Sequence, residues 1–484
     1  MSEDSRTLGQ GLIREHAIIA GKPVTSGSDT IAVDDPATGE IIGHVPNLGA
    51  DQTETAISAA AKAQRDWGRE NPHERAAFLR RWAALIDDHA EALAALMSLE
   101  NGKPLEEARG EVSYANGFIK WSAGEAERIM GESQRSPLGH TLITLREPVG
   151  PCALITPWNF PAAMLTRKLG PAFAAGCTAV VKPASQTPFT AIALVELAQQ
   201  AGLPDGVLSI VTGEAGPIGA ALTGSDHIRK LSFTGSTGVG RMLAEQCAPT
   251  LKRVSMELGG AAPLIVFEDA DIDASVDETI KGKFRNSGQT CVCPNRVYVH
   301  KKVARAFAEA LAEKVAGLKV GNAFTRGVKI GPLIEDKALE KVEAHIAKVT
   351  ASGARLLTGG SRHKLGGRFF EPSVTLGGDD TLFRTEETFG PLVPVFAFED
   401  EAEVIEKAND TPYGLASYLF TRDLDRAMRV ARALENGIVG VNTGLLSTPV
   451  APFGGVKQSG YGREGSTHGI DEYLDIKAVT LNLS

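Results

Sequence analysis

One cysteine stands in a setting where its thiol could act as a nucleophile. Cys291 follows a turn that contains Gly288, and such a turn can leave a thiol accessible to a substrate. A free thiol with a pKa of about 8.5 is only a few per cent thiolate at pH 7, yet it is strongly nucleophilic. A lone cysteine is more often a small buried hydrophobic residue. Residue type alone therefore leaves both interpretations open.

Two acidic residues could assist such a nucleophile. Glu257 ends an apolar segment and is followed by Gly259 and Gly260, so we expect its carboxylate to point into a cleft. A partly desolvated carboxylate has a raised pKa and can act as a general base. Glu387 lies in a second acidic turn, where a helix cap or an exposed loop is an equally good interpretation.

A second cysteine, Cys293, lies two residues after Cys291. Two cysteines in this spacing cannot complete the four ligands of a structural zinc site, and no His-rich motif accompanies them. We therefore expect no metal ion.

A glycine-rich turn covers residues 235–240, with the sequence Gly-Ser-Thr-Gly-Val-Gly, between an apolar strand and a helix. Glycines at this place would let the backbone approach a phosphate at a helix N-terminus. The turn departs from the dinucleotide fingerprint G-x-G-x-x-G because Thr237 occupies the third position. An ordinary strand-to-helix turn would have the same appearance.

Short apolar runs alternate with helical segments from Cys152 onward. The expected strands cover residues 153–155, 178–181, 207–211 and 231–233, with a helix at 189–201. Fully apolar strands separated by helices indicate a parallel sheet that is covered on both faces. Ligands of such sheets bind beyond the carboxyl ends of the strands. Four polar side chains fall there: Asn159, Lys182, Ser185 and Ser236.

The rest of the chain predicts a second α/β unit and a small β element. A second strand-and-helix series starts at residues 263–267 and continues to about Val441, which gives an α/β fold with two Rossmann-like units. Residues 1–50 are expected to wrap the surface. Two further strands, at 141–146 and 473–481, could pair with each other or with another chain. Oligomerisation and simple edge strands are equally good interpretations of them.

Composition limits the class of partner. The 484 residues carry 50 Lys and Arg against 59 Asp and Glu, a net charge of −9 with no basic block, which disfavours nucleic acid and membrane as partners. Five cysteines give no disulfide framework. The acidic N-terminus lacks a secretory signal, and no run approaches the ~20 apolar residues of a membrane span. We expect a cytoplasmic protein.

These motifs, in this order, resemble the aldehyde dehydrogenase superfamily. The resemblance runs from about residue 15 to the C-terminus and rests on segments 157–161 (PWNFP), 182–184 (KPA), 233–236 (FTGS), 257–260 (ELGG), 288–291 (GQTC), 387–391 (ETFGP) and 452–455 (PFGG). The family uses a G-x-T-x-x-G turn, which accounts for Thr237.

The resemblance implies a mechanism with three catalytic residues. The Cys291 thiolate attacks an aldehyde to give a thiohemiacetal, whose oxyanion is stabilised by the Asn159 amide and the Cys291 backbone N–H. Hydride loss leaves a thioester, and Glu257 activates the water that hydrolyses it.

The resemblance also implies a dinucleotide cofactor. It assigns cofactor contacts to Thr156, Pro157, Trp158, Lys182, Ser185, Gly235, Ser236, Leu258, Glu387 and Phe389. Relatives that prefer NAD usually carry Glu at the position of Ser185, where it repels a 2′-phosphate. A small hydroxyl beside the Lys182 ammonium suits that phosphate, so we expect NADP, with NAD as the weaker alternative.

Substrate residues follow from a similarity to the succinate-semialdehyde dehydrogenase branch. There Arg167, Arg285 and Ser447 would hold the distal carboxylate of a short semialdehyde. Succinate and glutarate semialdehyde remain alternatives because one methylene contributes only about 1–3 kcal/mol in a pocket. Acyl transfer to coenzyme A and a non-enzymatic role are disfavoured by the presence of Glu257 and Cys291.

The family further implies an oligomer and a domain division. We expect a cofactor-binding domain at 1–134 and 153–258, a catalytic domain at 259–448 and an oligomerisation element at 135–152 and 470–484. A homo-oligomer, dimer or tetramer, is expected. Some relatives form a disulfide between the cysteines that correspond to Cys291 and Cys293, which would switch off the nucleophile; ordinary packing of Cys293 is equally compatible with the sequence.

Overall fold

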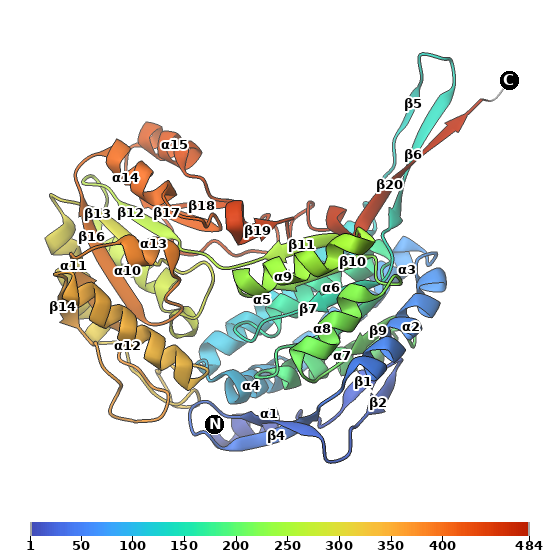
Figure 1. The fold of residues 1–484 in the computed structure, drawn as a ribbon, viewed down its shortest axis with the longest axis horizontal. Helices are drawn as coiled ribbons and strands as arrows, with labels where there is room; N and C mark the ends of the chain where they lie inside the picture. Colours follow the sequence, from blue (N-terminus) through green and yellow to red (C-terminus); the bar gives the residue numbers. More distant parts are fainter. Residues whose placement is uncertain (1, 483–484) are drawn as a thin grey trace.

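The computed structural model describes residues 2–482, which form two α/β lobes and a projecting β arm (Figure 1). The first lobe contains an eight-stranded sheet. In spatial order its strands are β19 (Gly460–Tyr461), β11 (Arg253–Glu257), β10 (Lys230–Thr234), β7 (Cys152–Ile155), β8 (Ala179–Lys182), β9 (Leu208–Ile210), β1 (Ala17–Ile19) and β2 (Lys22–Val24). The five strands from β11 to β9 are parallel, as their apolar runs predict.

Helices cover both faces of this sheet, which explains why its strands are apolar throughout. In β7, Cys152 and Leu154 pack into one core while Ala153 packs into the core on the opposite face. The first core includes helices α3 (Pro72–Asp88), α4 (Ala90–Asn101), α5 (Leu105–Ala126), α6 (Ala163–Ala175) and α7 (Pro188–Gln200). The second includes α2 (Ala50–Trp67), α8 (Ala215–Gly224) and α9 (Thr237–Cys247).

The second lobe contains a seven-stranded sheet. Its order is β14 (Arg355–Thr358), β15 (Ser373–Leu376), β16 (Leu392–Phe398), β13 (Arg296–His300), β12 (Pro263–Val266), β17 (Ala416–Phe420) and β18 (Ile438–Val441). All neighbours are parallel except β14 and β15. Its helices are α10 (Ile272–Lys283), α11 (Ala304–Ala316), α12 (Asp336–Ala351), α13 (Thr381–Thr385), α14 (Glu401–Asn409) and α15 (Leu424–Ala433).

The projecting arm is a three-stranded antiparallel sheet. Its strands are β20 (Leu474–Leu481), β6 (Thr141–Pro148) and β5 (Ser133–Arg135). The strands expected at 141–146 and 473–481 therefore pair with each other, from Leu474 opposite Pro148 to Leu481 opposite Thr141. The arm extends away from both lobes (Figure 1). Residues 483–484, part of the expected oligomerisation element, lie outside the described residues.

The first fifty residues are more ordered than their sequence indicates. They begin with α1 (Ser2–Gln10), which the sequence did not predict, and β1 and β2 then extend the first sheet. A separate hairpin pairs β3 (Thr30–Asp34) with β4 (Ile41–Pro46). Helix α1 has little apolar surface of its own, so its stability depends on packing against the lobe rather than on its sequence pattern.

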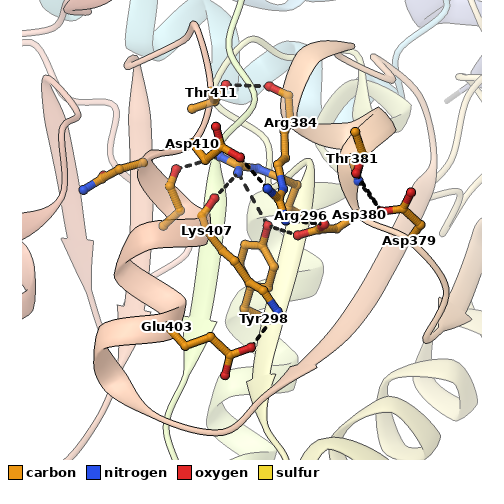
Figure 2. A network of polar contacts seen from close by, with 12 residues as sticks. Arg296, Tyr298, Asp379, Asp380, Thr381, Arg384, Glu403, Lys407, Asp410 and Thr411 are labelled. Carbon is orange, nitrogen blue, oxygen red and sulfur yellow. Dashed lines mark hydrogen bonds and ion pairs between the residues drawn. The ribbon is translucent and has the colours of Figure 1, made fainter.

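A buried polar network stabilises the second sheet at the start of β13, where Arg296 and Tyr298 lie (Figure 2). Arg296 donates to the carbonyl of Ala261 at 2.9 Å and to those of Lys407 and Ala408 at 2.8 and 3.0 Å. The Tyr298 hydroxyl donates to Asp380 at 2.6 Å. Buried polar groups must be satisfied in this way, and here the Arg296 contacts fix the chain where it passes from the first sheet to the second.

Candidate active site

A cavity of about 330 Å³ lies where the two lobes meet, at the carboxyl ends of β7, β10 and β11. It gathers ten residues that the sequence singled out. These are Pro157, Trp158, Asn159, Gly235, Ser236, Glu257, Leu258, Cys291, Glu387 and Phe389. The expectation that ligands bind beyond the strand ends is consistent with this location.

The crossing between the sheets brings Glu257 and Cys291 to the same cavity. Glu257 is the last residue of β11, and two glycines follow it. A Cβ atom at Gly260 would lie 2.5 Å from the carbonyl oxygen of Cys291, so only glycine allows this close approach. The Gly259 N–H donates to the Thr237 hydroxyl at 3.3 Å, which ties the crossing to the start of α9.

The turn before Cys291 has a strained backbone. Asn286 and Ser287 have φ values of 48° and 57°, a region that side chains other than glycine rarely adopt. Glu107 accepts the Asn286 backbone N–H at 2.7 Å, and the Ser287 hydroxyl donates to the Gly331 carbonyl at 3.0 Å. These two contacts fix the direction from which the chain reaches Cys291.

Cys291 is the one free cysteine within residues 2–482 that is only partly buried; the other four are buried. Burial of the thiol group raises its pKa to about 12, and the nearby Glu387 raises it further while Arg167 opposes the shift. The thiol is therefore protonated at neutral pH, and formation of the thiolate requires a proton acceptor.

Glu257 has the environment of a general base. Its side chain is 4% exposed, and neither carboxylate oxygen has a hydrogen-bond partner among the described residues. Burial raises its pKa well above the usual value; Glu464 adds to this, whereas Arg167 and Lys168 oppose it. A raised pKa matches a group that must accept and release protons near neutral pH.

One wall of the cavity is a loop that carries Glu387 and Phe389. Burial raises the pKa of Glu387 to about 8, and its carboxylate accepts the Gly260 N–H at 3.4 Å. Phe389 has a φ of 53°, and its ring lies edge-on to Trp158 with centroids 5.6 Å apart. Carboxylate and aromatic face together can hold a ribose and a flat ring.

Two residues that the sequence did not single out fix this loop. Asn295 donates to the carbonyls of Phe383 and Glu386 at 2.9 Å and accepts the Thr388 N–H at 2.9 Å. His345 from α12 contacts the Thr388 hydroxyl at 3.1 Å, and burial lowers its pKa to about 4, so the ring is neutral. Neither residue belongs to a motif from which its role could be read.

The groups expected to select the cofactor lie at the end of β8. Lys182 is 5% exposed, and its ammonium donates only to the carbonyl of the next residue, Pro183, at 3.0 Å within the described chain. Burial lowers its pKa to about 8. The Thr156 N–H donates to the Lys182 carbonyl at 3.1 Å, and Ser185 is partly exposed nearby in sequence. An under-partnered ammonium of this kind fits a phosphate.

A second cavity, of about 400 Å³, contains two of the three expected substrate residues. Arg285 and Ser447 both line it, together with Lys103, Glu107, Gly110, Glu111, Tyr114, Phe160, Lys281 and Leu445. The Arg285 guanidinium lies over the Phe160 ring at 5.2 Å. Phe160 is next to Asn159 in the chain, so this cavity adjoins the segment that lines the first.

Arg167 has a different environment from Arg285. It is 1% exposed, pairs with Glu464 at 2.5 Å and lies 4.0 Å from the centroid of the Phe453 ring. Its Nη2 has no hydrogen-bond partner among residues 2–482. Sequence reasoning missed Glu464 and its second cation, Lys168, because a lone acid in a glycine-rich tail gives no signal.

Cys293 is buried beside a lysine. Its sulfur lies 3.6 Å from the ammonium of Lys283 and donates to the Gly288 carbonyl at 3.3 Å. Cys291 and Cys293 are both free thiols. Over the described part of the chain, no cluster of three His, Cys, Asp or Glu side chains could hold a metal ion, and no helix is both long and apolar enough to span a bilayer.

Comparisons with known proteins agree with this arrangement. The chain is 54% identical over 478 residues to the glutarate-semialdehyde dehydrogenase of Pseudomonas putida, and these residues cover 98% of each chain. It is 53% identical to the NADP⁺ succinate-semialdehyde dehydrogenase of Escherichia coli, again over 98% of both. A crystal structure of an NADP-dependent enzyme from E. coli superposes with a TM-score of 0.97 at 53% identity, covering 98% of this chain and 99% of that one.

The sequence profile of the aldehyde dehydrogenase family matches residues 24–479, which is nearly the whole chain. The two-lobed α/β fold expected from the motifs is therefore confirmed, and this chain belongs to the aldehyde dehydrogenase family.

Proposed function

We propose that this protein oxidises a short semialdehyde, with succinate semialdehyde as the first candidate, to the corresponding acid with NADP. The observation that carries the proposal is one cavity that joins a thiol, a desolvated carboxyl group and a side-chain amide, next to a second cavity that contains Arg285 and Ser447. The names of the two relatives, a glutarate- and a succinate-semialdehyde dehydrogenase, support the substrate class.

The first step is attack of the Cys291 sulfur on the aldehyde carbon. The thiol proton must leave as the carbon–sulfur bond forms, and deprotonated Glu257 is an acceptor at the same cavity. The carbonyl oxygen becomes an oxyanion. The Asn159 amide, which already donates one N–H to the Gln289 carbonyl at 3.1 Å, has a second N–H for it. One lost donor of this kind costs about 10²–10³ in rate.

The second step converts the thiohemiacetal to a thioester and then to the acid. Bound NADP would supply the hydride acceptor, held by Glu387 and Phe389 with its phosphates near Ser236 and the N-terminus of α9. Glu257, which must first release the thiol proton to solvent, then takes a proton from water, whose oxygen attacks the thioester and releases Cys291 as the thiolate. Because Glu257 is present, water is favoured over coenzyme A as the acyl acceptor, and a non-enzymatic role is disfavoured.

The preference for NADP rests on Lys182 and Ser185. The Lys182 ammonium has room for a phosphate partner, and Ser185 adds a hydroxyl without negative charge. NAD remains the weaker alternative, since the ribose contacts do not require the phosphate. Thr156, Pro157, Trp158, Gly235 and Leu258 complete the proposed cofactor contacts.

The carboxylate of the substrate is assigned to Arg285 and Ser447, which line the second cavity. Arg167 lies outside that lining and is proposed as a third partner through its Nη2, which has no hydrogen-bond partner among the described residues. Guanidinium groups bind carboxylates in a bidentate manner and stay charged at all relevant pH values. Glutarate semialdehyde remains an alternative substrate, because one additional methylene changes the binding free energy by only about 1–3 kcal/mol.

The β arm is proposed as an oligomerisation element. Ile476 in β20 is 69% exposed and Leu145 in β6 is 41% exposed, and exposed apolar side chains that lie together can mark a protein–protein contact. A homo-oligomer, dimer or tetramer, would cover them. The division into cofactor-binding, catalytic and oligomerisation domains at the expected boundaries and a cytoplasmic location are part of the same proposal.

The charge at position 185 provides a test of cofactor selection. Ser185→Glu places a carboxylate next to the proposed 2′-phosphate site, so kcat/KM for NADP should fall at least about tenfold while that for NAD is retained or rises. Ser185→Gln is the matched control without charge. Equal losses with both cofactors would contradict the assignment, as would a preference of the unmodified enzyme for NAD.

Arg285 provides a test of the substrate class. The enzyme should turn over succinate and glutarate semialdehyde with a higher kcat/KM than butanal, measured from the absorbance of the reduced cofactor. Arg285→Ala should raise KM for the semialdehydes by about 10²-fold, the loss expected for a buried charged pair, and leave KM for butanal nearly unchanged. Similar changes for all three aldehydes would remove the carboxylate role.

The raised pKa of Cys291 predicts how its reactivity depends on pH. Below its pKa the thiolate fraction rises about tenfold per pH unit, so alkylation by iodoacetamide in the absence of cofactor should keep rising past pH 9. Cys291→Ser corrects for the remaining thiols. A plateau near pH 8 would show a thiol of ordinary acidity and contradict the desolvated site.

A further inference from the structure

Three buried side chains hold the two backbone carbonyls on either side of the Asn159 Cα atom. Asn101 donates to the Trp158 carbonyl at 3.0 Å. The Lys103 ammonium donates to the Asn159 carbonyl at 2.7 Å, and the Asn286 amide donates to the same oxygen at 3.0 Å. All three donors are 1% exposed. Because the peptide groups before and after a residue set the direction of its Cα–Cβ bond, these contacts determine where the Asn159 amide points.

Lys103 has a second partner that fixes its position. Its ammonium pairs with Glu111 of α5, which is also buried. The other oxygen of Glu111 accepts the backbone N–H groups of Ala162 and Ala163, at 3.0 and 3.3 Å, at the start of α6. The segment from Asn159 to Ala163 is thus held at both ends by one buried ion pair.

The ammonium is further stabilised by an aromatic ring. It lies 4.1 Å from the centroid of the Phe160 ring, a cation–π geometry. A buried charge is costly unless its partners are fixed, so the chain maintains Lys103 at this place only with Glu111, Asn159 and Phe160 around it. Asn286 also contacts the Asn159 carbonyl, but it belongs to the turn before Cys291, whereas Lys103 reaches the proposed chemistry through Asn159.

We propose that Lys103, fixed by Glu111, is a positioning residue that aims the Asn159 side-chain amide at the oxygen of the substrate carbonyl. This inference rests on the oxyanion role proposed above for Asn159. Loss of the ammonium lets the Asn159 peptide rotate and displaces the amide. A misplacement of about 1 Å can cost about 10² in rate.

The test is a double-mutant cycle. Lys103→Met alone leaves the Glu111 charge buried without a partner and could unfold the protein, so the principal variant is Lys103→Met with Glu111→Gln. The glutamine oxygen can still accept from Ala162 and Ala163, and no charge is left unpaired. This pair is combined with Asn159→Ala, and kcat/KM for the semialdehyde is measured at saturating NADP together with the thermal midpoint.

The expected result is a loss of kcat/KM of about 10²-fold in the variant that carries Lys103→Met and Glu111→Gln. These two changes should cause no further loss when they are added to Asn159→Ala. If the fold-loss of the Lys103→Met/Glu111→Gln variant multiplies fully with the fold-loss of Asn159→Ala, the positioning role of Lys103 is overturned while the oxyanion role of Asn159 stands. If Asn159→Ala itself retained full kcat/KM, the proposed oxyanion role would fall first and this inference with it. The two failures are therefore distinguishable.

A comparison of butanal with succinate semialdehyde distinguishes aiming of Asn159 from a direct electrostatic role of Lys103. Lys103 also lines the second cavity, where its charge could attract a substrate carboxylate. Aiming of Asn159 predicts the same fold-loss for butanal as for succinate semialdehyde, because both develop the same oxyanion. A loss confined to the semialdehyde would overturn the proposal. The matched control is Lys120→Met with Asp87→Asn, an exposed ion pair of α5 and α3, which should leave kcat/KM unchanged.

Discussion

Desolvation of two acids in one cavity is the constraint on which the rest of this structure depends. The Cys291 thiol and the Glu257 carboxyl group both have raised pKa values because of burial, and each negative charge would raise the pKa of the other. The proposed nucleophile and the proposed base therefore cannot both be ionised at low cost. Arg167 and Lys168 of α6, paired with Glu464, supply the positive charge that moderates this repulsion. A single proton can then move between sulfur, carboxylate and water in successive steps.

The fold satisfies this constraint by placing one of the two proposed reacting groups in each lobe. Glu257 ends β11 in the first lobe, while Cys291 lies in the turn before β13 in the second. The glycine crossing at 259–260 lets the two backbones approach, and Arg296 fixes the end of that crossing through the Ala261 carbonyl. Asn286, Ser287 and Phe389 are three of the eight non-glycine residues with positive φ in the described chain, and their surrounding contacts override the local backbone preference.

Sequence reasoning reached the elements whose periodicity or motif is local. The apolar runs at 153–155 and 231–233 became β7 and β10, and the strands at 141–146 and 473–481 pair with each other. The contacts it missed are long-range. Lys103, Glu111 and Glu464 look like ordinary surface charges in the sequence, because only tertiary packing removes them from water. Arg167 was expected at the substrate carboxylate, but its main partner is Glu464, from a segment about three hundred residues away.

Cys291 is proposed to carry the acyl group, and Glu257 is proposed to be needed for its release. Glu257→Gln keeps the size of the side chain but removes the base. With a semialdehyde and NADP, this variant should form about one equivalent of reduced cofactor per subunit, slowly because the thiol proton must then leave to solvent water, and then stop. Intact-mass and peptide analysis should then find one acyl group on Cys291. Continued turnover at the rate of the unmodified enzyme, or reduced cofactor formed with no acyl group on Cys291, would contradict these two roles.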